Sequence, residues 1–291
     1  MNKKEIKNPF LTVLIIYLIC LALHITEFLF LRTDQTIIGE AVIHKTLGIV
    51  ILVISCKIFG FSLKEIGFRT GKHFYSILKG LAFGAGVFLL AYTVEVMIAV
   101  SGGSFRSLQL YVSAYAIDKN VGNRTELIFF VICIIGNIIN VIMEEGNFRG
   151  LFIKVLESKH SFTKAAVISS CLFGFWHVIG PIRNYIDGEQ SFNGMIFSAI
   201  FMLVASALVG LKFTMLTKMS GNLYFSMGDH FFNNTIVNLL HVVTDTGADE
   251  LMTVRVTIAQ TVSFAIVLIC YLIRRKNNAL DNERKPEQAG T

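Results

Sequence analysis

The chain has 291 residues, of which 54% are hydrophobic and only 16% are charged, and its mean hydropathy is +0.63. Soluble domains carry about a quarter charged residues, so this composition excludes an ordinary soluble globular protein and a disordered one. It predicts an all-α, polytopic membrane helix bundle with about eight transmembrane helices of roughly 20 residues each. A separate soluble catalytic domain does not fit, so any chemistry must take place in or at the bilayer.

The formal net charge is +6, but its distribution argues against a nucleic-acid partner. The basic residues gather at the ends of apolar runs, where they set the orientation of membrane helices. The five cysteines lie in apolar stretches, their number is odd, and no CxxC spacing occurs. We therefore expect small buried hydrophobic residues rather than a disulfide framework or a zinc site.

The N-terminal part, residues 1–125, is expected to hold three transmembrane helices and a surface segment. The apolar run 10–31 is too long for the apolar region of a signal peptide, so it predicts an uncleaved first span. Glycines in the third span, Gly80, Gly84 and Gly86, predict the close approach of another helix. The expected elements are spans at 10–31, 41–60 and 77–100, a basic amphipathic surface segment at 61–74, and a polar connector at 101–125 with room for a short helix.

Residues 126–243 are expected to form the catalytic core, built from the fourth to the seventh helix. The fifth helix should end before Pro181. A last transmembrane helix occupies 244–276, and the polar tail 277–291 is expected to be disordered. The four core helices are predicted at 126–156, 162–179, 192–216 and 222–243, and the eighth span at 251–273.

The distribution of basic residues also predicts the orientation. If the N-terminus is cytoplasmic and the spans alternate, most lysines and arginines, among them Lys57, Lys154 and Lys212, fall on the cytoplasmic side. The acidic connector 245–250 then falls on the far side. This bias follows the positive-inside rule, so we expect a multi-pass protein of the cell membrane with both termini cytoplasmic and membrane lipid as its surroundings.

Ionisable side chains inside a span are costly, so they mark candidate functional sites. On the fourth helix, Asn137, Asn140 and Glu144 are spaced three and four apart and share one face. Glu145 and Arg149 are four apart and predict an ion pair on an adjacent face. Glu144 would then face the bundle interior and suit the role of general base. The alternative interpretation is a salt-bridged helix end at the cytoplasmic interface.

Two further helices carry polar residues at a spacing of four. Phe173 and His177 share a face of the fifth helix, and His230 and Asn234 share a face of the seventh. Alone, the first pair is typical of a packing histidine, and the second of a polar contact between membrane helices. Converging with a glutamate on one cavity, these side chains could activate water and stabilise an oxyanion. Asp229 could orient His230 or oppose its oxyanion role by repulsion.

Other polar residues in the spans are weaker candidates. His24 and Glu27 in the first span, and Glu95 in the third, are interpreted as polar contacts between helices or as cavity lining. His44 and Lys45 are expected near a membrane face, and Arg255 near the outer end of the eighth helix can extend its charge to the interface.

These motifs, in this order, resemble a known family. Glu144 to Arg149 matches EExxxR, Phe173 to His177 matches FxxxH, and His230 to Asn234 matches HxxxN. The ordered set, on separate hydrophobic helices, resembles the CPBP family of CAAX prenyl proteases and bacteriocin-processing or immunity proteins, also called the Abi family. The resemblance covers about residues 126–238.

The resemblance implies an all-helical intramembrane endopeptidase of the glutamate-dependent type. By motif, Glu144 would activate water, His177 would assist or position it, and His230 with Asn234 would stabilise the oxyanion. The implied supporting residues are Glu145, Arg149, Phe173 and Asn140. The implied substrate is a membrane-anchored or lipidated peptide.

The family has also been labelled metalloprotease, and Glu144, His177 and His230 could together ligate zinc. Glu144 would then be a ligand, and a separate general base would be needed. Because that ligand set leaves no free base, we favour a reaction without a metal and keep zinc as the alternative cofactor.

Three other functions remain as alternatives to this peptidase. The chain could be a bacteriocin self-immunity or peptide-maturation factor of the same family. It could be a non-catalytic scaffold or regulator in the membrane. A transporter with a proton relay of carboxylate and histidines is the third, although the chain shows no repeated halves.

Overall fold

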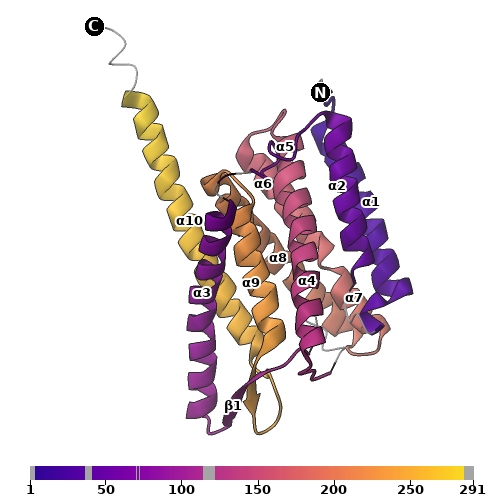
Figure 1. The fold of residues 1–291 in the computed structure, drawn as a ribbon, viewed down its shortest axis with the longest axis vertical. Coiled ribbons are helices and arrows are strands. Elements are labelled where there is room, and N and C mark those ends of the chain that lie inside the picture. Colours follow the sequence, from indigo (N-terminus) through magenta and orange to yellow (C-terminus); the bar gives the residue numbers. More distant parts are fainter. Residues whose placement is uncertain (1–3, 37–40, 70, 72, 114–121, 285–291) are drawn as a thin grey trace.

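The computed structural model describes residues 4–36, 41–69, 71, 73–113 and 122–284, with side chains described as far as residue 277. The helices run side by side along one axis in an elongated bundle (Figure 1). Helix α1 (Pro9–Thr26) begins at the end of the bundle where α10 (Met252–Arg284) ends. The fold is the polytopic α-helical bundle that the composition predicted.

The N-terminal part contains α1, α2 and α3. Helix α1 starts where Asn8 accepts a hydrogen bond from the backbone N–H of Leu11 at 3.1 Å, with Pro9 in the first helical position, a favourable start for a helix. The observed elements are α1, the π-helix η1 (Glu27–Leu31), the short 3-10 helix η2 (Thr33–Gln35), α2 (Ile43–Phe59), α3 (His73–Ser101) and strand β1 (Phe105–Leu110).

The predicted surface segment 61–74 contains turns between Leu63 and Gly67, and α3 already begins at His73. Positions 70 and 72 of this segment lie outside the described residues. The connector 101–125 was predicted with a possible helix, but it forms β1 instead, and its positions 114–121 lie outside the described residues.

The predicted core, residues 126–243, begins with one continuous helical rod, in which a π-helix interrupts the α-helix. The observed elements are α4 (Leu127–Glu144), the π-helix η3 (Glu145–Phe152), α5 (Ile153–Leu156), α6 (Phe162–Trp176), α7 (Ile179–Ile186), α8 (Phe192–Ser220), α9 (Tyr224–Leu239) and strand β2 (Leu240–Thr244). The predicted fifth helix therefore ends earlier, at Trp176, and Pro181 lies in the first turn of α7. A proline is tolerated there because the first N–H groups of a helix have no partner within it.

The predicted seventh helix also ends earlier, because the chain becomes a strand at Leu240. Strand β2 pairs antiparallel with β1, with Leu108 opposite Val242 and Leu110 opposite Leu240. This antiparallel sheet of two strands lies at one end of the bundle (Figure 1). At the other end, α10 continues to Arg284, so residues 277–284 are helical rather than disordered as predicted; residues 285–291 lie outside the described part.

Within the described residues, six helical segments are long and apolar enough to cross a membrane. They correspond to α1 with η1, α3, α4 to α5, α6 with α7, α8 and α10. The other two predicted spans are α2 and α9, which have only 17 and 16 residues. At about 1.5 Å per residue these two are shorter than a hydrocarbon core of about 30 Å, so the predicted count of eight is not confirmed.

Helices α3 and α9 pack very closely, as the glycines predicted. A Cβ atom on Gly80 would lie 2.2 Å from the carbonyl oxygen of Phe225, and one on Gly84 would lie 3.1 Å from Asp229 Oδ1. A side chain at Gly80 would therefore push α9 away. Gly86 faces open space and does not contribute to this contact.

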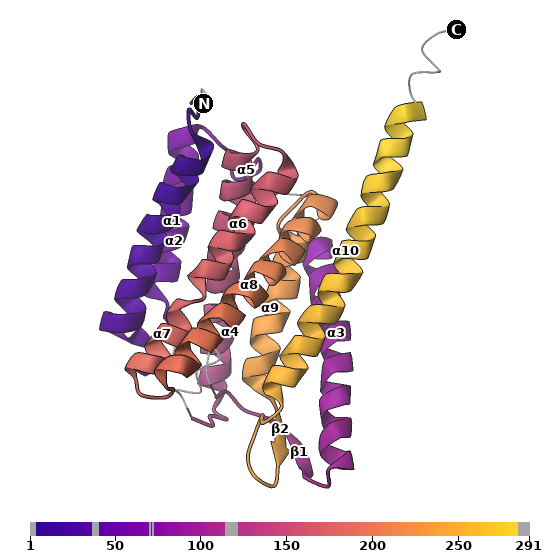
Figure 2. The ribbon, with the colours of Figure 1, turned by 180° about the vertical axis from the view of Figure 1, so that it is seen from behind.

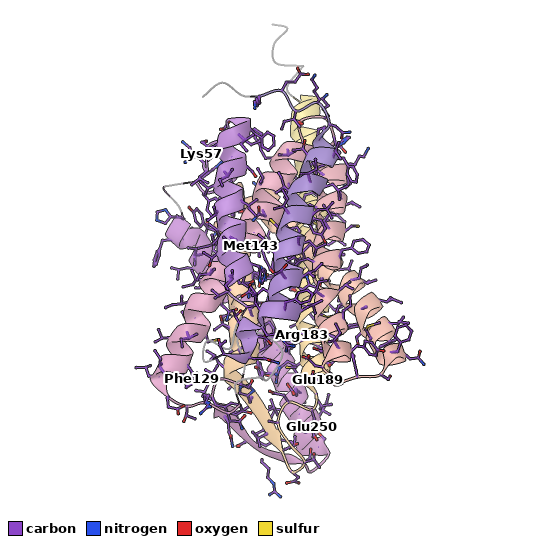
Figure 3. The ribbon with its side chains drawn as sticks, turned by 90° about the vertical axis from the view of Figure 1, so that its right-hand side faces the viewer. Lys57, Phe129, Met143, Arg183, Glu189 and Glu250 are labelled. Carbon is purple, nitrogen blue, oxygen red and sulfur yellow. The ribbon has the colours of Figure 1, made fainter. Side chains whose placement is uncertain are left out.

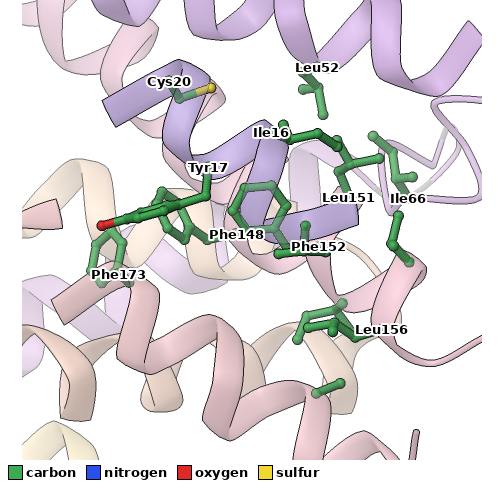
Figure 4. Packing of buried hydrophobic residues seen from close by; sticks show 14 of the residues in the cluster. Ile16, Tyr17, Cys20, Leu52, Ile66, Phe148, Leu151, Phe152, Leu156 and Phe173 are labelled. Atoms are coloured by element: carbon green, nitrogen blue, oxygen red, sulfur yellow. The ribbon is translucent and has the colours of Figure 1, made fainter. Parts of the chain in front are cut away.

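The largest apolar cluster joins α1, α2, η3 and α6 and includes Phe148 and Phe173 (Figure 4). The outer faces expose large apolar side chains, such as Phe197 on α8, whose helix lies on the side seen in Figure 2. Such a surface suits contact with lipid tails. Three of the five free cysteines are buried as expected, but Cys171 and Cys270 are exposed.

Candidate active site

The rod formed by α4, η3 and α5 carries two adjacent glutamates in the middle of the bundle. Figure 3 shows Met143, the residue before Glu144, about halfway between Lys57 near one end and Phe129 near the other. The α-helix becomes a π-helix directly after Glu144, and every residue from Glu145 to Phe152 is buried. Short π-helices are frequent at functional sites.

Glu145 is completely buried and contacts two basic side chains. Its Oε1 lies 2.9 Å from His230 Nδ1 and 3.5 Å from Arg149 Nη1. A carboxylate only accepts, so His230 donates its Nδ1–H. This bond fixes the ring of His230 and leaves its Nε2 directed away from Glu145.

Glu144 is 4% exposed and is less completely paired. Its Oε2 lies 3.5 Å from His230 Nε2, which is longer than an ordinary hydrogen bond. In the described part of the chain, this oxygen has no hydrogen-bond partner. Its buried carboxylate can therefore accept a proton without first breaking a strong internal bond. Asn140, on the preceding turn of α4, is buried as well, whereas Asn137 donates to the carbonyl of Cys133 in its own helix at 3.0 Å.

His177 follows the last residue of α6, and its orientation is fixed by one hydrogen bond. Its Nδ1 lies 2.8 Å from the carbonyl oxygen of Phe173. A carbonyl only accepts, so Nδ1 carries the hydrogen and Nε2 of the neutral ring is an acceptor. The ring interacts electrostatically with both Glu144 and His230. The structure thus brings His177 to the same cluster as Glu144.

The ring of Phe173 contacts both Arg149 and His177. The Arg149 guanidinium carbon lies 3.8 Å from the centre of its ring, and the rings of His177 and Phe173 are 4.5 Å apart between centroids. A cation over an aromatic face is stabilised by the ring quadrupole. Phe173 therefore holds Arg149 in place beside Glu145.

His230 and Asn234 lie one turn apart on α9. The His230 ring stacks on Phe213 of α8, with centroids 4.6 Å apart and an angle of 21° between the planes. Asn234 is half-buried, and within the described residues its side chain makes no hydrogen bond. Its amide N–H groups are hydrogen-bond donors one helical turn from His230.

Asp229 pairs with a lysine that the sequence analysis had assigned to the cytoplasmic side. Lys212 Nζ lies 2.9 Å from Asp229 Oδ2, and both side chains are buried. Lys212 also donates to Gln260 and Ser263, at 3.2 Å each. Because Lys212 balances the charge of Asp229, neither of the two roles considered for Asp229 describes its main contact.

The sequence analysis did not predict the contacts of His44. It is 2% exposed, and its Nδ1 lies 2.7 Å from Glu27 Oε2. The signal available in the sequence was weak, since His44 lies in the first turn of α2 with no partner at helical spacing. Lys212 gave a clearer signal, because a lysine within a long apolar helix needs a buried partner.

Zinc was the alternative cofactor, with Glu144, His177 and His230 as its ligands. A search of the described residues finds no group of three or more histidine, cysteine, aspartate or glutamate side chains that could hold a metal ion. Of the zinc ligands considered, His230 directs Nδ1 to Glu145, and its Nε2 lies 3.5 Å from Glu144 Oε2.

Residues 126–236 match the family model of Rce1-like type II CAAX prenyl endopeptidases. The matched region is less than half of the chain and contains all three motifs. No curated protein matches the chain. The match confirms the resemblance to the CPBP family within residues 126–236, and the six long apolar helices indicate a membrane protein.

Proposed function

We propose that the chain is an intramembrane endopeptidase that hydrolyses a peptide bond in a membrane-associated or lipidated peptide or protein. The observation that carries this proposal is the convergence of Glu144, His177 and His230 from three helices on one buried cluster. Each lies within the region that matches a prenyl endopeptidase family.

Glu144 is the general base in this proposal. Its carboxylate takes a proton from water, whose oxygen bonds to the scissile carbonyl carbon. The same proton then passes to the leaving nitrogen as the C–N bond breaks, so one water is consumed for each bond. His177, whose Nε2 is an acceptor, positions the attacking water from the other side.

His230 and Asn234 stabilise the oxyanion in this proposal. Glu145 takes the Nδ1–H of His230, so Nε2 also carries a hydrogen when the ring is protonated. That N–H and the Asn234 amide are then two donors for the developing negative charge. Arg149 shares Glu145 with His230, and Phe173 holds Arg149, so these residues support the oxyanion site through the imidazole.

The reaction is proposed to need no metal, because a zinc ion on Glu144, His177 and His230 would occupy the proposed base. The neighbouring carboxylate of Glu145 is already paired with Arg149 and His230. We also propose that the protein lies in the cell membrane with both termini cytoplasmic. The basic residues at the ends of α1 and α10 support this orientation, and these ends lie on the same side of the bundle.

The proposal is tested by comparing peptide termini in the membranes of cells that express the wild type or Glu144→Gln at equal levels. Glutamine keeps the size of the side chain and cannot act as a base. The control is Glu157→Gln, which changes a half-exposed glutamate paired with Lys218 at 3.0 Å. Termini that appear with the wild type and the control, and not with Glu144→Gln, are expected. Identical termini from all three would overturn the peptidase and favour a non-catalytic scaffold.

A further inference from the structure

Two adjacent residues of α8 contact two adjacent residues of α9. Lys212 Nζ lies 2.9 Å from Asp229 Oδ2. Next to this ion pair, the ring of Phe213 stacks on the ring of His230, with centroids 4.6 Å apart and an angle of 21° between the planes. All four side chains are buried, and the two helices lie side by side (Figure 2). Helix α8 therefore reaches the imidazole of the proposed oxyanion site directly.

The hydrogen bond with Glu145 fixes the His230 ring at Nδ1 but does not fix the tilt of its plane. The last torsion of a histidine side chain has a broad energy minimum, so the ring can turn about the line from Nδ1 to Glu145 Oε1. Nε2 does not lie on this line, so the turn would move it. The ring of Phe173 is perpendicular to the imidazole, at 89° and 6.4 Å between centroids, and does not cover its face. Phe213 does cover the face and therefore opposes this turn.

The Phe213 ring is itself held between two cationic side chains and is completely buried. Lys212 Nζ lies 4.5 Å from the centre of the ring, and the guanidinium carbon of Arg149 lies 5.3 Å from it. Such contacts are stabilised by the ring quadrupole. Arg149 also pairs with Glu145. The two groups that orient His230, the Glu145 carboxylate and the Phe213 ring, are therefore both linked to Arg149.

Lys212 keeps α8 at a fixed level along α9. An ammonium group has three N–H donors, and three acceptor groups lie within 3.2 Å of Lys212 Nζ: Asp229 of α9, and Gln260 and Ser263 of α10. A slip of α8 by one residue, about 1.5 Å, would pull a buried charge away from these acceptors, which is unfavourable inside a protein. The ion pair thus keeps Phe213 level with His230.

We propose that Phe213 is a positioning residue for His230: its ring holds the plane of the imidazole so that Nε2 stays beside Glu144 and can donate to the developing oxyanion. The inference rests on the peptidase proposed above. It adds to the machinery α8, which carries none of the three motifs. Lys212 acts one step further back by keeping Phe213 at this level.

Three substitutions separate positioning from packing. Phe213→Tyr keeps an aromatic ring over His230 and adds a hydroxyl in a buried position. Phe213→Leu keeps a large apolar side chain but removes the ring. Phe88→Leu makes the same truncation in α3, at a side chain that is 1% exposed and whose ring packs near Tyr92 and Phe232. It therefore reports the effect of a lost buried ring away from the imidazole.

The measurement is the rate at which wild-type-specific termini accumulate in cell membranes after induction, at equal protein levels. We expect Phe213→Leu to slow accumulation about tenfold or more, because a small misplacement of a catalytic group is costly. Phe213→Tyr and Phe88→Leu should remain within about threefold of the wild type. Phe197→Leu, on the exposed surface of the same helix, is the control and should leave the rate unchanged. If Phe213→Leu does not accumulate, Phe213→Met replaces it with the same expected result.

The thermal unfolding midpoint of each variant in detergent reports the packing role separately. A cavity should lower the midpoint in Phe213→Leu and in Phe88→Leu, and the extra hydroxyl should lower it in Phe213→Tyr. Positioning therefore predicts that the rate follows the presence of a ring at position 213 and not the midpoint.

Two results would overturn the positioning role. One is Phe213→Leu with the wild-type rate. The other is a rate that falls together with the midpoint in all three variants, Phe213→Tyr and Phe88→Leu included. In either case, loss of the termini in Glu144→Gln would leave the peptidase itself intact. If Glu144→Gln and the wild type give the same termini, the peptidase fails and the role of Phe213 fails with it.

Discussion

Two polar clusters lie inside this bundle, and their charged groups are paired to different degrees. At the end that carries the two strands, Arg255 bonds Glu95 at 2.7 Å and Asp249 at 3.1 Å, and Asp249 bonds His241 at 2.5 Å. In the middle, Glu144 Oε2 lies 3.5 Å from His230 without a hydrogen bond in the described part of the chain. The first cluster connects α3, α10 and β2, whereas in the second a buried carboxylate oxygen lacks a hydrogen bond among the described residues.

The comparison teaches how to distinguish structural from functional polar groups inside a membrane protein. In the Arg255 cluster, His241 also directs Nε2 to the carbonyl oxygen of Tyr111 at 3.0 Å, so both ring nitrogens face acceptors. Among the described residues, Glu95 Oε1 and Arg255 Nε have no hydrogen-bond partner, but every charged side chain of this cluster has an ion-pair partner. Paired networks of this kind rigidify a fold. Buried groups that lack partners are tolerated where function requires them. The variants below are ordered from the largest expected effect to the smallest.

Glu144→Gln should have the largest effect on activity and almost none on stability. Loss of the base is expected to reduce the cleavage rate on the order of 10⁴-fold. Since the substitution removes a poorly paired buried charge, the unfolding midpoint should stay equal or rise. Thermal unfolding of the purified protein in detergent checks this. A clear fall in the midpoint would mean that Glu144 is structural, like the Arg255 cluster.

Arg255→Met should have a large effect on stability and a small effect on activity. Its side chain is completely buried, and its removal leaves Glu95 and part of Asp249 without a counter-charge. Breaking a buried pair by removing one partner costs about 3–5 kcal/mol, which chemical denaturation in mixed micelles can measure. Arg275→Met, an exposed arginine near the end of α10, is the control. An unfolding free energy equal to the control would contradict the structural role of this cluster.

Asn234→Ala should reduce cleavage by about 10²–10³-fold, the usual effect of removing one oxyanion donor. The side chain is half-buried and makes no hydrogen bond within the described residues, so stability should change little. Asn193→Ala, at the exposed start of α8, is the matched control. If cleavage remains at the control rate, Asn234 is not a donor to the oxyanion.

Acid should act on the Arg255 cluster through Asp249. Burial alone would raise the pKa of Asp249, but the hydrogen bond with His241 and the charge of Arg255 lower it below its ordinary value of 3.8. The stabilisation is therefore present above that ordinary value and is lost as the pH falls through the lowered pKa of the folded state. This is the smallest effect, because the destabilisation by acid is absent near neutral pH. Unfolding midpoints between pH 7 and pH 3 should fall more steeply for the wild type than for Asp249→Asn, and parallel slopes would contradict this contribution.

The sequence predicted contacts best where they depend on spacing within one helix. The pairing of Glu145 with Arg149 and the shared face of His230 and Asn234 follow from a spacing of four. The sequence could not show which helices meet, and this is why the partners of His44 and Lys212 were not predicted. Their contacts depend on the packing of α2 against α1 with η1 and of α8 against α9.

The sequence also failed to predict the two π-helices and the end of α9. Neither π-helix follows from composition, although both begin at a glutamate of a glutamate–histidine pair. The end of α9 at Leu239 depends on pairing of the next residues with β1, a contact between segments about 130 positions apart in the chain. Such pairings have no local signal, so the predicted helix to residue 243 was too long.

The most direct test of the account is to follow cleavage in membranes suspended in water enriched in ¹⁸O. If Glu144 activates water, each new C-terminal carboxyl formed by the wild type should carry one heavy oxygen, and Glu144→Gln should form none of these termini. New termini that lack the heavy oxygen, or that form equally in Glu144→Gln, would contradict hydrolysis by Glu144.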